Sequence, residues 1–490
     1  MAEKVGGVSI GVKAFITSAI ILLAMMIAAG VLTLVLPSGS YERIKADGGE
    51  VLVPGSYHET PKPDYPVWRW FTAPAEVLVS PDALMAIIII LFITIAGGSF
   101  SVLNEGRVLA SAVAALAKRF GKRRFLLLGI ICLFCMLLGA IMGVFEESVL
   151  LVPVGIALAA SFGWDVFMGL GMSVLATGFG FAAAISNPFS IGTAQKIAGL
   201  PLFSGAPFRV LVFAACYAMY MAFLVAYARS IEGKGRPAAI EVASGRVAGG
   251  RVAGGRVASG TIVTEKSAID PRLEARGVRV FSWSMLALLV IILFVAFTPG
   301  LSDLSMPLMA LSFLAAGLVT GFAAGLSGKR VGKAFLDGAL GVLPAALLIL
   351  MALSVKRIIL AGGILDTVLF HAATAATGAS AYGSAAIAYI LTLGLEFFVG
   401  SASAKAFLLM PILAPLGDLA GVTRQVMVQA YAFGDGFSNM LYPTNAVLII
   451  SLSLAGVSWL RWAKWVLPLQ LATFVLTMGL LMLAVAIGYR

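Results

Sequence analysis

Charged residues are scarce in this sequence. Asp, Glu, Lys and Arg make up 12% of its 490 residues, whereas 60% of the residues are hydrophobic. This balance excludes a soluble domain, because a soluble protein of this length could not bury so much apolar side chain away from water. A lipid bilayer accepts it, so we expect an all-α polytopic membrane protein that has the bilayer as a partner.

Histidine and cysteine are also rare, with two histidines and three cysteines in the chain. There is no His-Glu-x-x-His motif, and neither His58 nor His371 falls in a convincing core span, which argues against an intramembrane enzyme. Cys132 and Cys135 have the Cys-x-x-Cys spacing, but we interpret them as inert small residues of a membrane helix. No ATP-binding motif is present, so we expect no direct ATP drive and no cofactor other than a coupling Na⁺ or H⁺.

Basic residues outnumber acidic ones by 34 to 23, for a net charge of +11. Much of this excess lies in short loops, where it sets orientation in the membrane and does not indicate a nucleic-acid partner. The basic clusters at 118–124 and 329–333 and the basic segment 229–281 are expected in the cytoplasm. We therefore expect a multi-pass membrane protein with a cytoplasmic N-terminus, whose apolar run 14–36 is a first span and not a signal peptide.

Two distant segments carry the same pattern. Residues 143–148 (tip 1) are followed by Pro153 and Gly163, and residues 400–405 (tip 2) by Pro411 and Gly421. The offset is constant, since 411 − 153 = 258 and 421 − 163 = 258. Each tip leads to a second interruption rich in Ser, Asn and Pro, at 186–188 (break 1) and 438–445 (break 2). Paired Gly- and Pro-broken hydrophobic segments in two halves of a membrane protein indicate a transporter binding site.

Spacing and loop charge together predict two inverted repeats, 1–230 and 282–490, joined by a low-complexity cytoplasmic linker over 231–281. Each repeat is expected to contain a re-entrant hairpin, at 125–161 and 382–418, and a broken helix, at 165–200 and 424–455. The alternative for 125–161 is two full crossings with a turn on the outer surface. The repeat and the short second arm favour the hairpin, whose non-helical tip must then line an enclosed cavity.

Tip 1 carries two adjacent carboxylates, Glu146 and Glu147, followed by Ser148. Ionised side chains at membrane depth are costly and are usually retained for function. We interpret these residues as a substrate-binding face for an amine, Na⁺ or H⁺. The alternatives are a surface turn and an ion pair with a basic neighbour.

Tip 2 carries Ser401, Ser403 and Lys405, which we also assign to substrate binding. Lys405 aligns with Glu147 under the constant offset. The two residues either pair across the pseudo-twofold axis or divide a zwitterion, with Lys405 binding the carboxylate and Glu147 the amine. Hairpin tips also present helix N-termini, whose free N–H groups bind anions.

The breaks supply backbone carbonyls and short polar side chains, which are the ligands a coupling ion needs. We assign coupling-ion binding to Ser186, Asn187, Ser190, Asp435 and Ser438. Asn187 is also a candidate substrate ligand. The remaining polar residues of break 2 are candidate substrate ligands: Asn439, Thr444 and Asn445. The alternative for Asp435 is a buried carboxylate held by local N–H groups.

Three of these motifs carry a resemblance to a known family. Phe145-Glu146-Glu147, Asn187-Pro188-Phe189 and the run from Phe433 to Asn439 resemble the YfcC family, which belongs with the DcuC C4-dicarboxylate carrier group of the ion transporter superfamily. The resemblance implies a hairpin-and-broken-helix fold, a homodimer formed through a scaffold domain, and an elevator-type mechanism. It also implies transport of basic amino acids or of dicarboxylates, and a location in the bacterial inner membrane. At tip 2 the chain departs from the family, because Lys405 stands where a neutral residue is usual.

Taken together, the sequence predicts a secondary active transporter of a small carboxylate-bearing solute, working by alternating access with ion coupling or exchange. An amino acid, including a basic one, is the expected substrate, and a C4-dicarboxylate is the alternative. A channel and an intramembrane enzyme are remote alternatives. Adjacent glutamates on a helix point about 100° apart, which makes them a poor acid–base pair.

Overall fold

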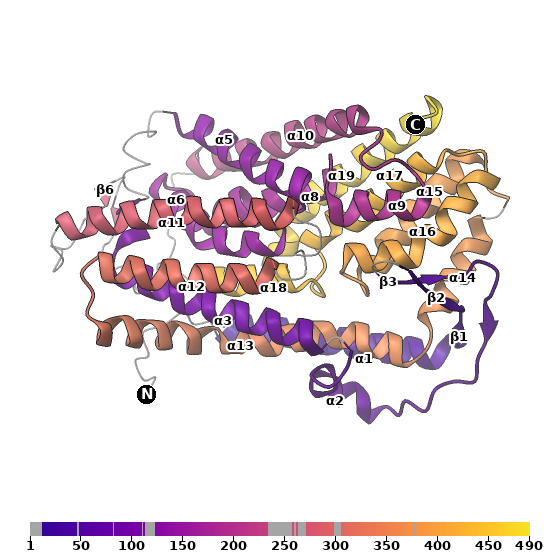
Figure 1. The fold of residues 1–490 in the computed structure, drawn as a ribbon, viewed down its shortest axis with the longest axis horizontal. Coiled ribbons are helices and arrows are strands. Elements are labelled where there is room, and N and C mark those ends of the chain that lie inside the picture. The colour runs from indigo at the N-terminus through magenta and orange to yellow at the C-terminus, as the bar shows by residue number, and fades with distance from the viewer. Residues whose placement is uncertain are drawn as a thin grey trace.

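The computed structural model shows a chain that is almost entirely helical (Figure 1). Most of the predicted linker and residues 118–122 of the first basic cluster lie outside the part of the chain that is described. The described residues are 12–46, 49–81, 83–109, 111–112, 123–233, 257–258, 261–262, 271–297, 305–376 and 378–490.

Eight helices within these ranges are long and apolar enough to cross a membrane, judged by length and composition. The strands are short and pair two by two: β1 (Gly39–Ser40) with β4 (His58–Glu59), β2 (Arg43–Ala46) with β3 (Gly49–Leu52), and β5 (Val257–Ala258) with β6 (Thr261–Ile262). An all-α polytopic membrane protein is therefore the correct fold class.

One set of packed helices, the first helix group, consists of α1 (Val12–Val35), α3 (Ala83–Glu105), α11 (Pro271–Phe297), α12 (Ser305–Ala323) and α13 (Gly328–Ala361). Small residues let α3 and α13 approach closely, because a Cβ added to Gly338 would overlap the backbone oxygen of Gly97. Gly97 lies against Val342 and Ser101 against Gly338, so these two helices run antiparallel.

The segment between α1 and α3 covers one end of the molecule. It contains β1 to β4 and α2 (Trp68–Val77), and it contacts α14 (Leu365–Ala376). Arg43 Nη2 lies 2.8 Å from Asp366 Oδ1, and the backbone N–H of Tyr41 donates to Asp366 Oδ2. The C-terminal ends of α1 and α13 therefore meet at this end (Figure 1).

The second helix group begins with a helical hairpin, hairpin 1. Helix α5 (Arg124–Leu137) continues as a π-helical turn (Leu138–Met142), reverses at Gly143, and returns through a 3₁₀ helix (Glu146–Leu151) and α6 (Val152–Ser161). Gly143 has φ +71°, a conformation that favours glycine at the reversal. Both ends of hairpin 1 lie beside the C-terminal end of α10 (Ala206–Gly233), since Arg124 and Trp164 both bind Glu232.

The second hairpin, hairpin 2, consists of α15 (Ala381–Glu396) and α16 (Ala402–Leu419). Its ends lie at the opposite end of the molecule, near the N-terminus of α10. There Arg424 donates to the carbonyl of Ala198 at 2.8 Å, and Tyr489 donates to the carbonyl of Gly205 at 2.8 Å. The two hairpins thus enter the bundle from opposite ends.

Each hairpin is followed by an interrupted helix. The first, broken helix 1, comprises α7 (Val166–Leu170), a π-helical turn (Gly171–Leu175), α8 (Ala176–Ala183), a second π-helical turn (Pro188–Gly192) and α9 (Thr193–Ala198). Broken helix 2 comprises α17 (Arg424–Gly436), a 3₁₀ turn (Phe437–Met440) and α18 (Ala446–Ala455). Helix α19 (Trp459–Ala486) closes the group and packs against α10, α15 and α17. The two helix groups touch where α18 meets α13 and where α19 meets α1.

Candidate functional site

Tip 1 is built against break 1. The backbone N–H of Ser186 donates to the carbonyl of Ala140 at 3.0 Å, and the Ser186 hydroxyl donates to the carbonyl of Ile141 at 3.3 Å. Gly143 has no room for a side chain, because a Cβ there would overlap Asn187. The non-helical backbone of break 1 is therefore satisfied partly by the arm that leads into tip 1.

Asn187 holds the restart of broken helix 1. Its Oδ1 accepts from the N–H groups of Phe189 at 2.9 Å and Ser190 at 3.3 Å, while its Nδ2 donates to the carbonyl of Phe181 at 3.3 Å. Pro188 follows at the first helical position, where its missing N–H costs no hydrogen bond. Asn187 thus acts as an N-cap in this conformation, whereas the buried hydroxyl of Ser190 has no hydrogen-bond partner among the described residues.

The two carboxylates of tip 1 have different surroundings. Glu147 is half-buried, and its Oε2 accepts from the N–H of Phe145 at 2.9 Å. Glu146 is exposed, and the segment Glu146–Leu151 packs against α12 and α18. Ser148 is buried, and its hydroxyl donates to the carbonyl of Phe145. Neither glutamate forms an ion pair within the described ranges, so both can receive a cationic group.

Tip 2 reaches across to break 1. Ser401 caps α16 by accepting from the N–H of Ala404 at 3.4 Å. The hydroxyl of Ser403 donates to the carbonyl of Phe189 at 3.2 Å. A residue of the second half is thereby bonded to the residue that follows the break of the first half.

Lys405 is fully buried and lies between two carboxylates. Its Nζ is 2.8 Å from Asp435 Oδ1 and also forms an ion pair with Glu396. One of the two alternatives for Lys405, a pair with Glu147, is wrong, because both partners of Lys405 come from its own half. Nor does Lys405 have a free ammonium for a substrate carboxylate in this conformation.

Glu396, the last residue of α15, is a site residue that the sequence analysis missed. The signal was present, since Glu396 is the single charged residue in the apolar stretch 384–404. An ionisable residue in such a stretch is a functional candidate by default.

Break 2 is held by its own asparagines. Asn445 caps α18 by accepting from the N–H of Leu448 at 3.1 Å, and its Nδ2 donates to Asn439 Oδ1. Asn439 Nδ2 donates to the carbonyl of Asp435 at 3.0 Å, and the Ser438 hydroxyl donates to the carbonyl of Gly434 at 3.4 Å. Thr444 is half-buried beside them.

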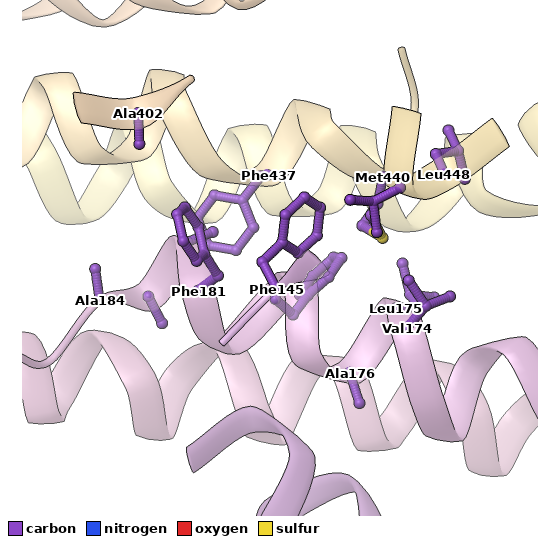
Figure 2. Close-up of a cluster of buried hydrophobic side chains, with 14 of the residues drawn as sticks. Phe145, Val174, Leu175, Ala176, Phe181, Ala184, Ala402, Phe437, Met440 and Leu448 are labelled. Atoms are coloured by element: carbon purple, nitrogen blue, oxygen red, sulfur yellow. The ribbon is translucent and has the colours of Figure 1, made fainter. Parts of the chain in front are cut away.

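An apolar cluster joins the two broken helices (Figure 2). The rings of Phe179 and Phe437 lie 5.2 Å apart, and the rings of Phe145 and Phe181 lie 5.4 Å apart. Figure 2 shows Phe145 and Phe181 of the first half facing Phe437 and Met440 of the second. Break 1 therefore contacts tip 1, tip 2 bonds to Phe189 beside break 1, and Met440 of break 2 packs against Gly178 of the first half.

A second polar cluster, also missed from the sequence, lies at the far end of the broken helices. Gln195 Nε2 donates to Gln425 Oε1 at 3.1 Å. Arg209 is fully buried and donates to the carbonyls of Ile185 and Ser204. Because backbone carbonyls already accept from this guanidinium, we interpret the cluster as structural: its hydrogen bonds hold α9, α10 and α17 together.

Comparison with known proteins gives a family match over nearly the whole chain. The family model described as DcuC, C4-dicarboxylate anaerobic carrier, matches residues 15–486. The chain is 30% identical over 331 residues to the "Putative basic amino acid antiporter YfcC" of Escherichia coli, and 28% identical over 304 residues to an "Uncharacterized protein" of Haemophilus influenzae. These alignments cover 65% and 61% of this chain, but 62% and 56% of the two relatives' own lengths. The resemblance to the YfcC family and the DcuC group is thus confirmed.

Two solved transporters are more distant. The YdaH transporter of Alcanivorax borkumensis is 15% identical, with a TM-score of 0.41 over 97% of this chain and 98% of that one. MtrF of Neisseria gonorrhoeae, described as illuminating a class of antimetabolite efflux pumps, is 17% identical, with a TM-score of 0.37 over 96% of this chain and 95% of that one. TM-scores this low indicate only a remote likeness.

Proposed function

Because this chain belongs to the DcuC family, which consists of carriers and not enzymes, we propose that it is a secondary active transporter of a small carboxylate-bearing solute. The observation that supports this most is the bond from Ser403 of tip 2 to Phe189, the residue after break 1. It places polar elements from both halves around a single centre, as expected of a carrier that binds its substrate between two repeats.

The two hairpins are best explained as re-entrant, and the two halves as inverted repeats. Helix α6 has 10 residues. With the 3₁₀ segment Glu146–Leu151 before it, the return arm reaches about 27 Å, so the re-entrant interpretation rests on where the two tips lie and not on the length of this arm. Hairpin 1 and hairpin 2 enter from opposite ends, so their tips would meet near mid-membrane. The second helix group would move against the first in an elevator motion, and the first group would form the homodimer contact.

An amino acid suits this site because its ammonium needs an anionic partner and its carboxylate needs N–H donors or a cation. Glu146 and Glu147 of tip 1 are available for the ammonium group. Lys405 is engaged, so the substrate carboxylate would bind the backbone N–H groups of helix starts, near the caps Ser401 and Asn445. Ser403, Asn439 and Thr444 would supply neutral hydrogen bonds.

A C4-dicarboxylate is the second candidate, favoured by the description of the matching family. With this substrate the glutamates of tip 1 would bind a coupling cation. Ser190 is the best placed of the proposed ion ligands in break 1, because its buried hydroxyl has no partner among the described residues. Ser186 and Ser438 already donate to backbone carbonyls, so their own oxygens remain able to accept an ion.

The proposed location is the bacterial inner membrane with the N-terminus in the cytoplasm. Helix α13 begins beside Lys329, Arg330 and Lys333, and α1 begins at the same end of the molecule (Figure 1). A basic cluster of this kind marks the cytoplasmic side.

The test is counterflow in proteoliposomes with labelled arginine, a neutral amino acid and a C4-dicarboxylate, each with and without Na⁺. We expect exchange of an amino acid by the wild-type protein and its loss in Glu147→Gln. Asp418→Asn is the matched control, because Asp418 is an exposed carboxylate paired with Arg424 far from the tips. Exchange of the dicarboxylate alone would replace the amino-acid assignment, and exchange of none of the three would contradict the proposal.

A further inference from the structure

The cluster formed by Glu396, Lys405 and Asp435 has one more negative charge than positive charges when all three groups are ionised. Lys405 has an exposed side-chain fraction of 0%, and each carboxylate has 1%. An uncompensated charge in such a site is expensive, and the cost grows at membrane depth. Asp435 Oδ2 is buried without a hydrogen-bond partner among the described residues, so one acceptor in the cluster is unused.

We propose that the Glu396–Lys405–Asp435 cluster holds the coupling proton of the transport cycle, one proton shared by its two carboxyl groups. This inference rests on the proposed transport function. One bound proton makes the cluster neutral, and its release leaves a net charge of −1 that opposes movement through the membrane. Lys405 is therefore an internal counter-ion and not a substrate ligand.

A proton fits this cluster better than a metal ion does. The ammonium of Lys405 already occupies the position between the two carboxylates, 2.8 Å from Asp435 Oδ1. A Na⁺ ion at the same carboxylates would lie against that ammonium and would be repelled by it. A proton needs only one oxygen atom and no ligand cage.

The neighbouring tyrosines are engaged elsewhere. Tyr431 donates to the carbonyl of Ala402, Tyr442 donates to the carbonyl of Leu393, and the Tyr389 hydroxyl bonds to Thr477. Most charged groups on the elements packed against α15, α16 and α17 are exposed: Glu50, Lys196, His371, Asp418, Arg424, Arg461 and Lys464. Two are buried: Asp366 pairs with Arg43, and Arg209 of α10 donates to backbone carbonyls. Within the described ranges, no further ion pair reaches the cluster.

The net charge left in the cluster predicts how each substitution changes proton binding. Glu396→Gln or Asp435→Asn leaves one carboxylate with Lys405, a neutral pair that needs no proton. Either variant should therefore lose the proton dependence of transport. Lys405→Met leaves two carboxylates and should bind protons more readily than the wild type does.

The first experiment needs no substrate. Infrared difference spectra of the purified protein, recorded over a pH titration, report the carbonyl stretch of protonated carboxyl groups. We expect both Glu396→Gln and Asp435→Asn to lose the intensity of one titrating carboxyl group, and Asp418→Asn to retain it. Unchanged intensity in the two cluster variants would overturn the proposal.

The second experiment uses the three labelled solutes in proteoliposomes. A pH difference of one unit is expected to change accumulation by about tenfold in the wild type if one proton moves per substrate. Any exchange that the two cluster variants retain should show no response to the pH difference, and Asp418→Asn should respond as the wild type does. A Na⁺ gradient that drives accumulation in the absence of a pH response would overturn the coupling role. Failure of all exchange would contradict the transport function itself, and the infrared result would still decide whether the cluster binds a proton.

Discussion

The hydroxyl of Ser403 donates a 3.2 Å hydrogen bond to the carbonyl of Phe189, although the two residues are 214 positions apart in the chain. Ser403 belongs to tip 2 and Phe189 follows break 1. The bond therefore joins the two halves of the molecule at the centre where we place the substrate.

Ser403→Ala should weaken substrate binding without unfolding the protein. The neutral hydrogen bond that we assign to Ser403 and the substrate would contribute about 1 kcal/mol, which corresponds to roughly a fivefold change in affinity. The measurement is the concentration dependence of counterflow. Ser380→Ala is the control, because Ser380 caps α15 at an exposed position away from the tips. Equal losses of affinity in both variants would show that Ser403 does not bind the substrate.

Gly180→Ala should strongly destabilise the second helix group. A Cβ at Gly180 would overlap the carbonyl of Met136 in the neighbouring α5, and backbone cannot move aside as a side chain can. Overpacking of this kind costs about 1–3 kcal/mol or more. Thermal unfolding in detergent measures the effect.

Gly479→Ala is the matched control, because a Cβ there meets nothing within 4 Å. Its helical position should gain up to about 1 kcal/mol from the better helix propensity of alanine. A fall in melting temperature for Gly479→Ala as large as that for Gly180→Ala would contradict the packing explanation.

Lys405→Met should cost more stability than any single change to its partners. It leaves Glu396 and Asp435 buried without a cation, and loss of one member of a buried ion pair costs about 3–5 kcal/mol. Glu396→Gln and Asp435→Asn remove the excess charge instead. The triple variant without any charge should recover much of the loss, which a mutant cycle on thermal unfolding would measure. No recovery would indicate that Lys405 acts through packing alone.

The loop segment at the end of the molecule offers a pH test. The hydrogen bond from Arg69 lowers the pKa of Glu76 below its usual range. Because the folded-state pKa is depressed, the stabilisation is present above the ordinary Glu pKa of about 4.3 and is lost as the pH falls through the lower folded value. The difference in melting temperature between the wild type and Glu76→Gln should therefore shrink on acidification below about pH 4. A constant difference would show that the carboxylate charge is not involved.

The sequence was sufficient where chemistry is local. Composition identified the membrane class, and Gly, Pro, Ser and Asn marked the reversals and the helix restarts near Gly143, Asn187 and Asn445. The caps at Asn187 and Asn445 follow from side chains that bond to their own backbone a few residues away.

The sequence was insufficient where contacts cross from one element to another. The partners of Lys405 depend on how α15, α16 and α17 pack, and no spacing rule links residues 396, 405 and 435. Alignment of the two repeats suggested Glu147 as the partner of Lys405. That suggestion failed because equivalent positions in two repeats need not be neighbours in space. The Gln195–Gln425 contact joins the two halves over 230 residues and has no local signal either.

The central claim is that tip 1, tip 2 and the two breaks form one site that opens alternately to each side of the membrane. The direct test is labelling of Ser403→Cys by a membrane-impermeant thiol reagent, applied to either side of oriented vesicles. The three native cysteines are buried and give a low background. We predict labelling from both sides, with protection by whichever solute exchanges. Labelling from one side only, unaffected by any transported solute, would contradict a shared and alternately accessible site.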